Sequence, residues 1–192
     1  MERAAASGFI AAGMESRAAE IADFEQVVHR YRPRILRFVL ASVQDAETAE
    51  GLTQDCFWKA YRSRTGFRGD ASVHTWLMRI AINVVRDHAR NRRLQFWKRA
   101  GRSAVDSAAL ADWLPDPALS QEQQALIRER LQAVWEAART LSARQRTVFL
   151  LRFVDEMDIC DIAIATGLSS NAVNVHLHRA VKAIRRRVGN RR

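Results

Sequence analysis

The chain has 192 residues, 48% of them hydrophobic, which is enough to bury the core of one large domain or two small ones. Its two cysteines have no CxxC spacing, which excludes a disulfide framework and a structural zinc site, and no apolar run approaches the length that spans a bilayer. Lysine and arginine outnumber aspartate and glutamate by 31 to 21, so the net charge of +10 favours a polyanionic partner. We expect a cytoplasmic protein that is not inserted in a membrane and holds no metal or cofactor.

Three stretches of helical periodicity follow one another in the first half of the chain. The apolar residues from Phe24 onward follow helical spacing, and Pro33 predicts a kink or a break between two helices. Residues 46–62 form an amphipathic pattern with Asp45 as a candidate N-cap, and SVHTWLMRIAINVVRDHARNRR forms another that ends in an arginine-rich turn. We predict a first small helical domain over residues 21–94.

The remaining segments divide into an arm, a linker and a second helical domain. Residues 1–20 are alanine-rich without a sustained pattern and are interpreted as a loose arm, whereas residues 95–121 lose periodicity and are interpreted as a linker. Over residues 122–192 a first helix is followed by a capping box at Ser142 and Gln145, a short helix, a glycine-containing turn and a longer basic helix. This order predicts a helix-turn-helix, within an all-α fold of two small domains.

The last predicted helix, LSSNAVNVHLHRAVKAIRRRV, separates an apolar face from a polar and basic one. No Asp or Glu follows Asp161, so this end of the chain carries only positive charge. Val175 lies on the polar face, where a merely solvated helix would more often carry Lys, Glu or Gln. A basic tail can serve solubility alone, but the position of Val175 favours a surface that contacts a specific partner.

The two halves together resemble the extracytoplasmic-function (ECF) sigma factors, which carry only the second and fourth conserved regions of bacterial primary sigma factors. AEGLTQDCFWKAYR is similar to the family's polymerase-binding helix, and FRGDASVHTWLMRIAINVVRDHAR is similar to its promoter-melting segment. LSARQRTVFLLRF and DIAIATGLSSNAVNVHLHRAVKAIR resemble its promoter-recognising helix-turn-helix. The resemblance covers about residues 24–188. It implies a sigma factor, with region 2 in residues 21–94 and region 4 in residues 122–192.

The resemblance also implies a function and three sets of contact residues. Such a protein binds RNA polymerase core, recognises the −35 and −10 promoter elements and assists DNA melting, with no enzymatic chemistry of its own. The residues facing the clamp helices of the largest polymerase subunit are Leu52, Gln54, Asp55, Phe57 and Tyr61. The residues at the −10 element are Trp76, Arg79, Asn83, Arg86 and Arg90. The residues at the −35 element are Asn171, Asn174, Val175, His178, Arg179 and Lys182.

Several of these residues have a second interpretation. Leu52 and Phe57, and likewise Trp76, lie on apolar stripes and can belong to the core instead. The sequence also departs from the family pattern. Gly51 stands where the family usually has an acid, which affects the polymerase contact, and Asn174 stands where Lys or Arg is frequent. We therefore expect a promoter preference that differs from that of typical members.

The implied partners are promoter DNA and RNA polymerase core, through its clamp helices and its flap, with an anti-sigma factor as a further candidate. A polymerase-independent helix-turn-helix regulator is the alternative, but it leaves the first half of the chain without a role. A nuclease is a second alternative, since such enzymes gather carboxylates around metal ions. The candidate carboxylates are Asp155, Glu156, Asp158 and Asp161. They crowd one turn, where caps and solvated charges explain them more simply.

Overall fold

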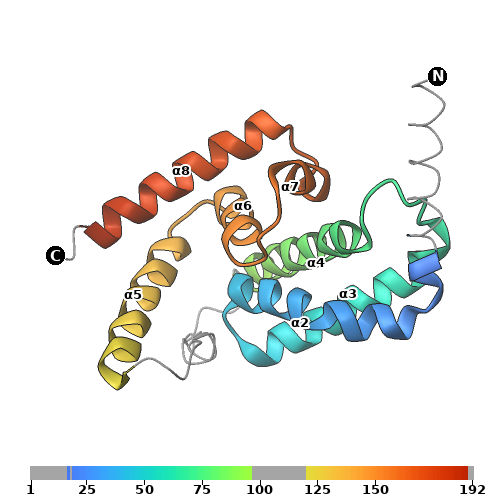
Figure 1. Cartoon of the computed structure of the whole chain (residues 1–192), viewed down its shortest axis with the longest axis horizontal. Helices are drawn as coiled ribbons and strands as arrows, with labels where there is room; N and C mark the ends of the chain where they lie inside the picture. Colours follow the sequence, from blue (N-terminus) through green and yellow to red (C-terminus); the bar gives the residue numbers. More distant parts are fainter. Residues whose placement is uncertain (1–16, 18, 97–119, 190–192) are drawn as a thin grey trace.

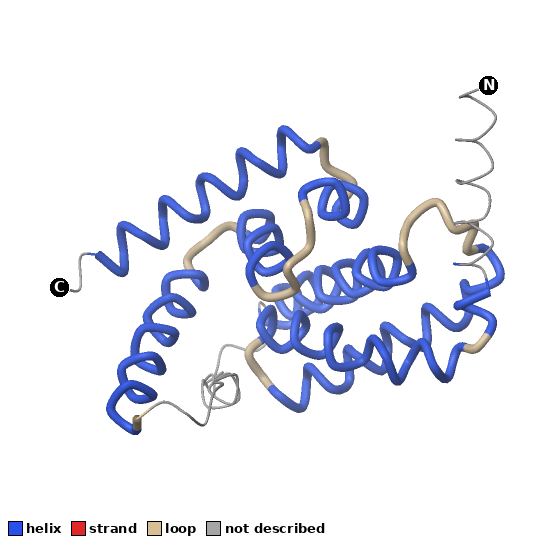
Figure 2. Tube along the Cα trace, in the orientation of Figure 1, coloured by secondary structure: helices blue, strands red, loops and turns tan. Residues whose placement is uncertain are grey.

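The computed structural model describes residue 17, residues 19–96 and residues 120–189, and within these ranges the chain is all-α (Figures 1 and 2). The predictions of a loose arm over residues 1–20 and of a linker over residues 95–121 fall largely outside the described residues. The elements are α2 (Phe24–Val43), α3 (Ala46–Ser63), η1 (Arg64–Gly66), α4 (Val73–Phe96), α5 (Gln121–Arg139), α6 (Ala143–Phe153), α7 (Ile159–Thr166) and α8 (Ser170–Gly189).

The first half is formed by α2, α3 and α4, which pack on one another around a shared core. Phe38 of α2 and Leu77 of α4 are among its fully buried side chains. The predicted cap of α3 is confirmed, because the side chain of Asp45 accepts a hydrogen bond of 2.8 Å from the backbone N–H of Thr48. A cap of this kind satisfies a donor that the first helical turn would otherwise leave unpaired.

Helix α2 corrects the prediction of a break at Pro33, because it continues through this residue as a single helix, whereas the alternative prediction of a kink stays untested. Proline removes one intrahelical hydrogen bond and costs about 3 kcal/mol in a helix interior. Tyr31 and Ile35 lie on either side of Pro33, and both are buried in the core. Burial of a large apolar side chain contributes about 1.5–3 kcal/mol. The apolar stripe on both sides of the proline therefore offsets its cost, and two helices do not form.

The second half contains the predicted helix-turn-helix. Ser142 and Gln145 form the expected capping box at the start of α6, each side chain bonding the backbone N–H of the other residue. The short helix α7 ends at Gly167, whose φ of 71° lies in the left-handed region and whose N–H donates to the carbonyl of Ala163. This turn directs the chain into α8, which packs on both α6 and α7.

The two halves are in contact, with α4 against α7 and α2 against α6 (Figure 1). Asp155, in the turn between α6 and α7, is only 2% exposed at this junction. The expectation that the acids of this turn are solvated charges is therefore wrong for Asp155. Its burial could not be inferred from its neighbours in the sequence, because the groups that cover it belong to the other half.

The turn between α6 and α7 also holds Glu156 at a φ of 58°, in the left-handed region. This conformation costs a non-glycine residue roughly 1–2 kcal/mol, whereas glycine adopts it without strain. Glycine also makes the unfolded chain more flexible, which offsets part of this gain in stability. We predict that Glu156→Gly stabilises the protein by about 0.5–1 kcal/mol in urea unfolding. The matched control is Gly167→Ala, in the same backbone region with open space around an added Cβ, which should destabilise the protein. A loss of stability in both variants would contradict the strain at Glu156.

Candidate nucleic-acid interface

Helix α8 presents a polar face to solvent along its whole length. Its opposite face is fixed by Val173, Ala180 and Ile184, which are buried within the second half. All six residues predicted to contact the −35 element are exposed, namely Asn171, Asn174, Val175, His178, Arg179 and Lys182. Val175 is 47% exposed although it is apolar. The helix therefore offers amide, apolar and cationic groups together, which are the groups that distinguish base pairs in a major groove.

Helix α4 carries the second predicted set of contact residues. Arg79, Arg86 and Arg90 are exposed, and Asn83 is partly buried beside them. The side-chain carbonyl of Asn83 accepts a hydrogen bond of 2.9 Å from Nη2 of Arg86. This bond orients the amide and leaves its NH₂ group as a donor. An oriented amide next to cations suits contact with an unpaired base and its phosphates.

Trp76 was predicted either to contact the −10 element or to belong to the core, and the structure allows both, because the side chain packs against the core and is only partly buried. Its ring centroid lies 5.2 Å from that of Phe67, in the loop that joins η1 to α4. Trp76 thus fastens this loop to α4 through an aromatic contact. The same loop contains Gly69 at a φ of 77°, a conformation that favours glycine. The structure gives Trp76 a positioning role toward the loop and leaves part of its ring accessible.

Helix α3 divides its predicted contact residues between surface and core. Gln54 and Asp55 are exposed, and Tyr61 is 43% exposed. Phe57 is buried in the core and Leu52 is partly buried against it, in agreement with the alternative prediction that these two residues belong to the core. The three exposed residues form a polar and aromatic surface on α3, which Phe57 supports from beneath.

Comparisons with known proteins connect these surfaces to a family. The family models "Sigma-70 region 2" and "Sigma-70, region 4" match residues 27–95 and 131–184. The chain is 32% identical to the RNA polymerase sigma-H factor of Pseudomonas aeruginosa, over 84% of its own length and 83% of that protein's. It is 29% identical to the ECF RNA polymerase sigma-E factor of Escherichia coli, over 86% of each chain. The chain belongs to the ECF sigma factors of the sigma-70 family.

A solved structure shares the fold of this sigma factor across both halves. It is the sigma factor RpoE in complex with the anti-sigma factor NepR from Bartonella quintana, with a TM-score of 0.70 and 22% identity. The likeness covers 88% of this chain and 99% of that chain. Membership of the family gives the protein its function, which is to bind RNA polymerase and direct the initiation of transcription.

The sigma factor has an exposed tryptophan that the sequence patterns did not single out. Trp58, on α3, is 61% exposed and its ring stacks on Tyr61, with centroids 6.4 Å apart and an interplanar angle of 17°. The guanidinium of Arg64 lies 3.6 Å from the centroid of the Tyr61 ring. Phe24 of α2 packs edge-on against both Tyr61 and Phe57. Aromatic contacts therefore connect the core of the first half to Trp58 at its surface.

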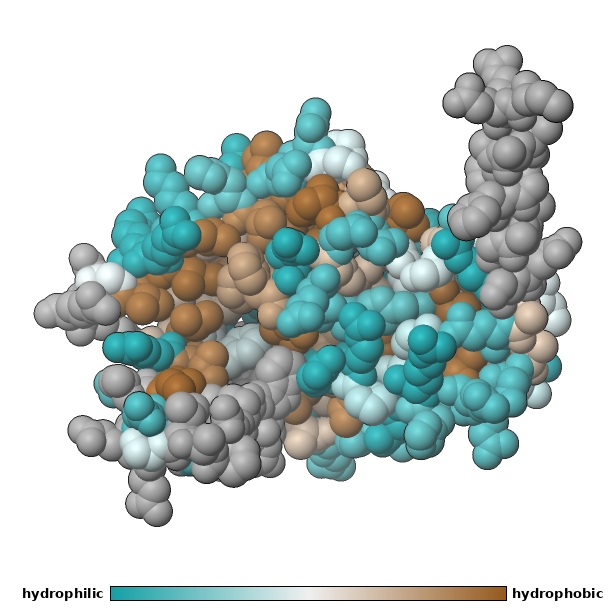
Figure 3. Space-filling model, viewed as in Figure 1, coloured by the Kyte–Doolittle hydropathy of each residue, from teal (hydrophilic) through white to brown (hydrophobic). Residues whose placement is uncertain are grey.

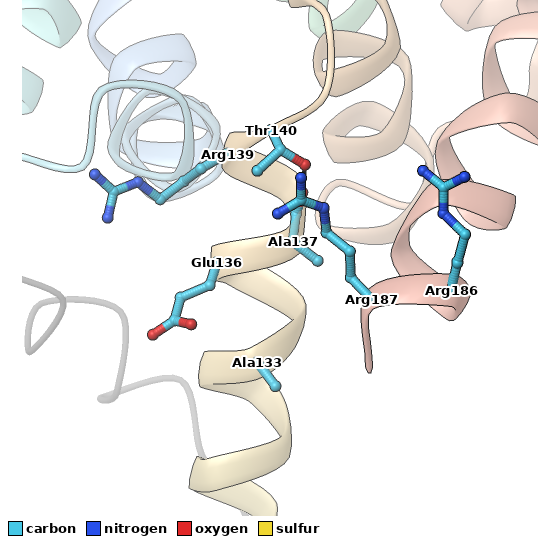
Figure 4. Close-up of a pocket in the computed structure, with 7 residues that line it drawn as sticks. All are labelled: Ala133, Glu136, Ala137, Arg139, Thr140, Arg186 and Arg187. Atoms are coloured by element: carbon cyan, nitrogen blue, oxygen red, sulfur yellow. Dashed lines mark hydrogen bonds between the residues drawn. The ribbon is translucent and has the colours of Figure 1, made fainter. Parts of the chain in front are cut away.

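A trough lies between α5 and α8 of the sigma factor. Figure 3 shows apolar side chains gathered on the surface between these two helices. At its end is a cavity of about 600 Å³, where Arg187 of α8 is directed toward Thr140 of α5 (Figure 4). An apolar trough of this kind suits the apolar face of a partner helix.

The remaining titratable groups indicate structural roles in the described part of the sigma factor. Cys56 is fully buried, and burial raises the pKa of its thiol to about 12, so that it stays protonated and unreactive. In residues 17, 19–96 and 120–189, no three His, Cys, Asp or Glu side chains lie where they could share a metal ion. No helix in these ranges is long and apolar enough to cross a membrane.

We predict that Arg179→Ala and Lys182→Ala weaken promoter binding in different ways. Arg179 is expected to contact a base edge, so its loss should cost on the order of 1–3 kcal/mol at one base pair and relax specificity there. Lys182 is expected to contact phosphate, so its loss should weaken binding to all sequences and lower the salt slope by about one. Holoenzyme binding to a library randomised in the −35 element, at several salt concentrations, measures both quantities.

Arg30→Ala, at an exposed arginine of the first half, is the control for this comparison. It should change neither base preference nor salt slope. If Arg179→Ala and Lys182→Ala gave the same base preferences and the same salt slope, the division between base and phosphate contacts would be wrong.

Proposed function

We propose that this sigma factor recruits RNA polymerase core to promoters with separate −35 and −10 elements and helps to open the second element. In this proposal residues 122–192 act as region 4 and residues 21–94 as region 2. The exposure of all six predicted −35 residues on one face of α8 is the observation that carries the proposal. The nucleotidyl transfer belongs to the polymerase, and this chain supplies promoter specificity and strand capture.

At the −35 element, α8 enters the major groove and contacts both bases and backbone. Arg179 has the geometry to pair with guanine and Asn174 to pair with adenine, whereas the exposed Val175 can meet the methyl group of thymine. Lys182 and Arg185, farther along the exposed face, lie where phosphate contacts are expected. Phosphate contacts add affinity and fix the position of the helix without selecting a sequence.

At the −10 element, α4 and the loop before it hold the unpaired strand. The loop is fastened by the contact between Phe67 and Trp76, so it has a fixed surface on which a base can lie. Asn83, oriented by Arg86, can bond the edge of that base. Arg79 and the other exposed arginines of α4 then compensate the phosphate charge. These groups stabilise the open strand, because stacked and paired bases in a duplex cannot reach them.

On the polymerase side, α3 binds the clamp helices of the largest subunit through Gln54, Asp55, Trp58 and Tyr61. The exposed carboxylate and amide can pair with basic groups of the partner. Trp58 is held by stacking on Tyr61, and rigid exposed tryptophans are among the residues that contribute most to binding. Gly51 lies on the same exposed face, and an added Cβ would meet nothing within 4 Å in the free protein. It leaves space for a partner helix to approach closely.

Two further contacts complete the proposal. The apolar trough between α5 and α8 is the candidate site for the polymerase flap, because a helical flap element could bury its apolar side there. An anti-sigma factor is the candidate regulator, by analogy with the solved complex described above. In this proposal the protein works in the cytoplasm, where RNA polymerase is found.

We predict that Trp58→Ala weakens binding to core polymerase at least tenfold with little change in stability, because the side chain is mostly exposed in the free protein and is a candidate binding anchor. Asp55→Lys should weaken it as well, by reversing a contact charge. Glu25→Lys, a charge reversal at an exposed position of α2, is the control. Affinity for core and transcripts made by the reconstituted holoenzyme are the measurements.

Gly51→Ala separates binding from stability on the same helix. The free protein should become more stable by about 1 kcal/mol, since alanine is the better helix former. Its affinity for core should fall if a helix of the polymerase packs against this face. Full affinity in Trp58→Ala, Asp55→Lys and Gly51→Ala together would remove α3 from the polymerase interface. Tight binding of duplex −35 sites by the chain alone, with no stimulation of core polymerase, would favour a polymerase-independent regulator.

A further inference from the structure

The loop of residues 67–72, which joins η1 to α4, is held at both of its ends by α4. Phe67 packs on Trp76, as described above, and the hydroxyl of Ser72 accepts a hydrogen bond of 3.0 Å from the backbone N–H of Thr75. We call this segment the −10 loop, because the proposed function assigns it to the −10 element. The contacts with α4 hold the two ends of the loop and leave its middle to other partners.

The middle of the −10 loop is Gly69, and its partner comes from the N-terminal end of the described chain. Nη1 of Arg17 donates to the backbone carbonyl of Gly69 at 3.1 Å, across 52 positions of the sequence (Figure 1). Gly69 is buried and adopts a φ of 77°. Glycine has many backbone conformations of similar energy, so its own preferences do not fix the loop. The hydrogen bond from Arg17 selects one of these conformations.

The residues next to Arg17 are themselves anchored to α2. A carboxylate oxygen of Glu20 accepts a hydrogen bond of 2.8 Å from the hydroxyl of Tyr31, and Ile21 is only 7% exposed. Burial, and after it the bond to Glu20, raises the pKa of the Tyr31 hydroxyl above its ordinary value, so this group stays protonated and remains a donor. Residues 19–22, which are helical, therefore form a fixed base from which Arg17 reaches the loop.

Tyr31 connects this base to the end of the −10 loop as well. Its ring stacks on that of His74, near the start of α4, with centroids 5.8 Å apart and an interplanar angle of 22°. The N-terminal residues thus contact the loop directly at Gly69, and indirectly through Glu20 and Tyr31 where the loop enters α4. A loop that is held at two points by one segment has less freedom to rotate than a loop held at one.

Arg17 and Glu20 lie outside the stretch that identifies the family. The match to Sigma-70 region 2 begins at residue 27, so both residues precede it. Membership of the family therefore does not account for their contacts with the −10 loop and with α2.

We propose that Arg17 is a positioning residue for promoter opening, which holds the −10 loop in the shape that receives an unpaired base. This inference rests on the proposed function of α4 and the −10 loop. A loop that is already ordered spares the complex the entropic cost of ordering it when the base arrives. Arg17 acts on the base through Gly69, so its loss should affect the −10 element without removing a contact to DNA.

Cleavage of the free, full-length protein by trypsin tests the effect of Arg17 on the loop. Trypsin cuts after arginine, and local opening of the loop exposes the bond between Arg68 and the buried Gly69. Arg17→Ala should accelerate cleavage at this bond by about threefold to tenfold, the effect of one net hydrogen bond on an opening equilibrium. Arg17→Lys keeps a donor and should restore most of the protection. Mass spectrometry of the early products that end at Arg68 measures the rate.

Arg32→Ala is the matched control. Arg32, like Arg17, is an exposed arginine of the first half, but its ion pair with Glu50 joins α2 to α3 and does not involve the −10 loop. Its loss should leave the rate of cleavage after Arg68 unchanged. Because Arg17 is exposed, its own replacement leaves the core intact, and circular dichroism of each variant checks this.

Base preference at the −10 element tests the consequence for the promoter. Holoenzyme selects from a single-stranded DNA library randomised over the −10 element, and sequencing gives the preference at each position. Asn83→Ala should abolish the preference at the position whose base lies on the loop, because Asn83 is proposed to bond the edge of that base. Arg17→Ala should lower the preference at the same position by about threefold to tenfold, with the other positions and the salt slope unchanged. Arg32→Ala should match the wild type.

Two results would overturn the role of Arg17. One is a rate of cleavage after Arg68 that does not change in Arg17→Ala. The other is a base preference that Asn83→Ala alters and Arg17→Ala does not. In the second case, a uniform loss of affinity with a salt slope lowered by about one would identify Arg17 as a direct phosphate contact.

Failure of the proposed function would give a different result. A wild-type holoenzyme with no base preference at any position, or with a preference that Asn83→Ala leaves intact, would contradict the proposed role of α4 and the −10 loop. The cleavage measurement needs neither polymerase nor DNA, so it would still report on the contact between Arg17 and Gly69.

Discussion

A buried carboxylate, that of Asp155, determines how the two halves of this sigma factor meet. A charge taken out of water is stable only with partners nearby, and the partners of Asp155 are Arg34 and His74 of the other half. Burial of Asp155 and docking of the halves are therefore one event. If the halves separated, the acid and its partners would be hydrated again, whereas separation of an equally large apolar interface would expose surface that water disfavours.

The functional surfaces are distributed around this junction. The α3 surface with Trp58 and the α8 surface with Val175 are both exposed while the halves are docked. Neither surface has to be created for the protein to meet its partners. In the docked arrangement α4 and α8 both pack on α7, so the two helices that are predicted to contact DNA lie near one another.

The sequence predicted features that depend on local patterns. Helical periodicity located the helices of both halves, and the polar signals at Asp45 and Ser142 identified real caps. The exposure of the −35 residues followed from the same periodicity, since the apolar face of α8 fixes where the other side chains are directed. The contact roles of these residues stay predictions. They depend on partners that are not part of the chain.

Features that depend on distant contacts were missed or mistaken. Asp155 was interpreted as a solvated charge, because its partner Arg34 is 121 positions away in the sequence. Pro33 was expected to kink or break the first helix, and the break does not occur, because the burial of apolar side chains on both sides of it outweighs its local cost. Trp58 was overlooked because it belongs to neither the apolar stripe nor the polar motif of α3. Its exposure and its stacking on Tyr61 are visible only in three dimensions.

The distance between the two halves, measured in the free protein and in a promoter complex, tests most directly whether the docking through Asp155 is a property of the free protein alone. Spin labels can be attached to the exposed Cys160 of α7 and to His29→Cys on α2, whereas burial keeps Cys56 unreactive. Pulsed electron paramagnetic resonance should give one short distance in the free protein. In a complex with core polymerase and a promoter carrying both elements, the distance should lengthen toward the roughly 80 Å between the elements. A short distance that persists in a complex competent for initiation would contradict the separation of the halves at a promoter.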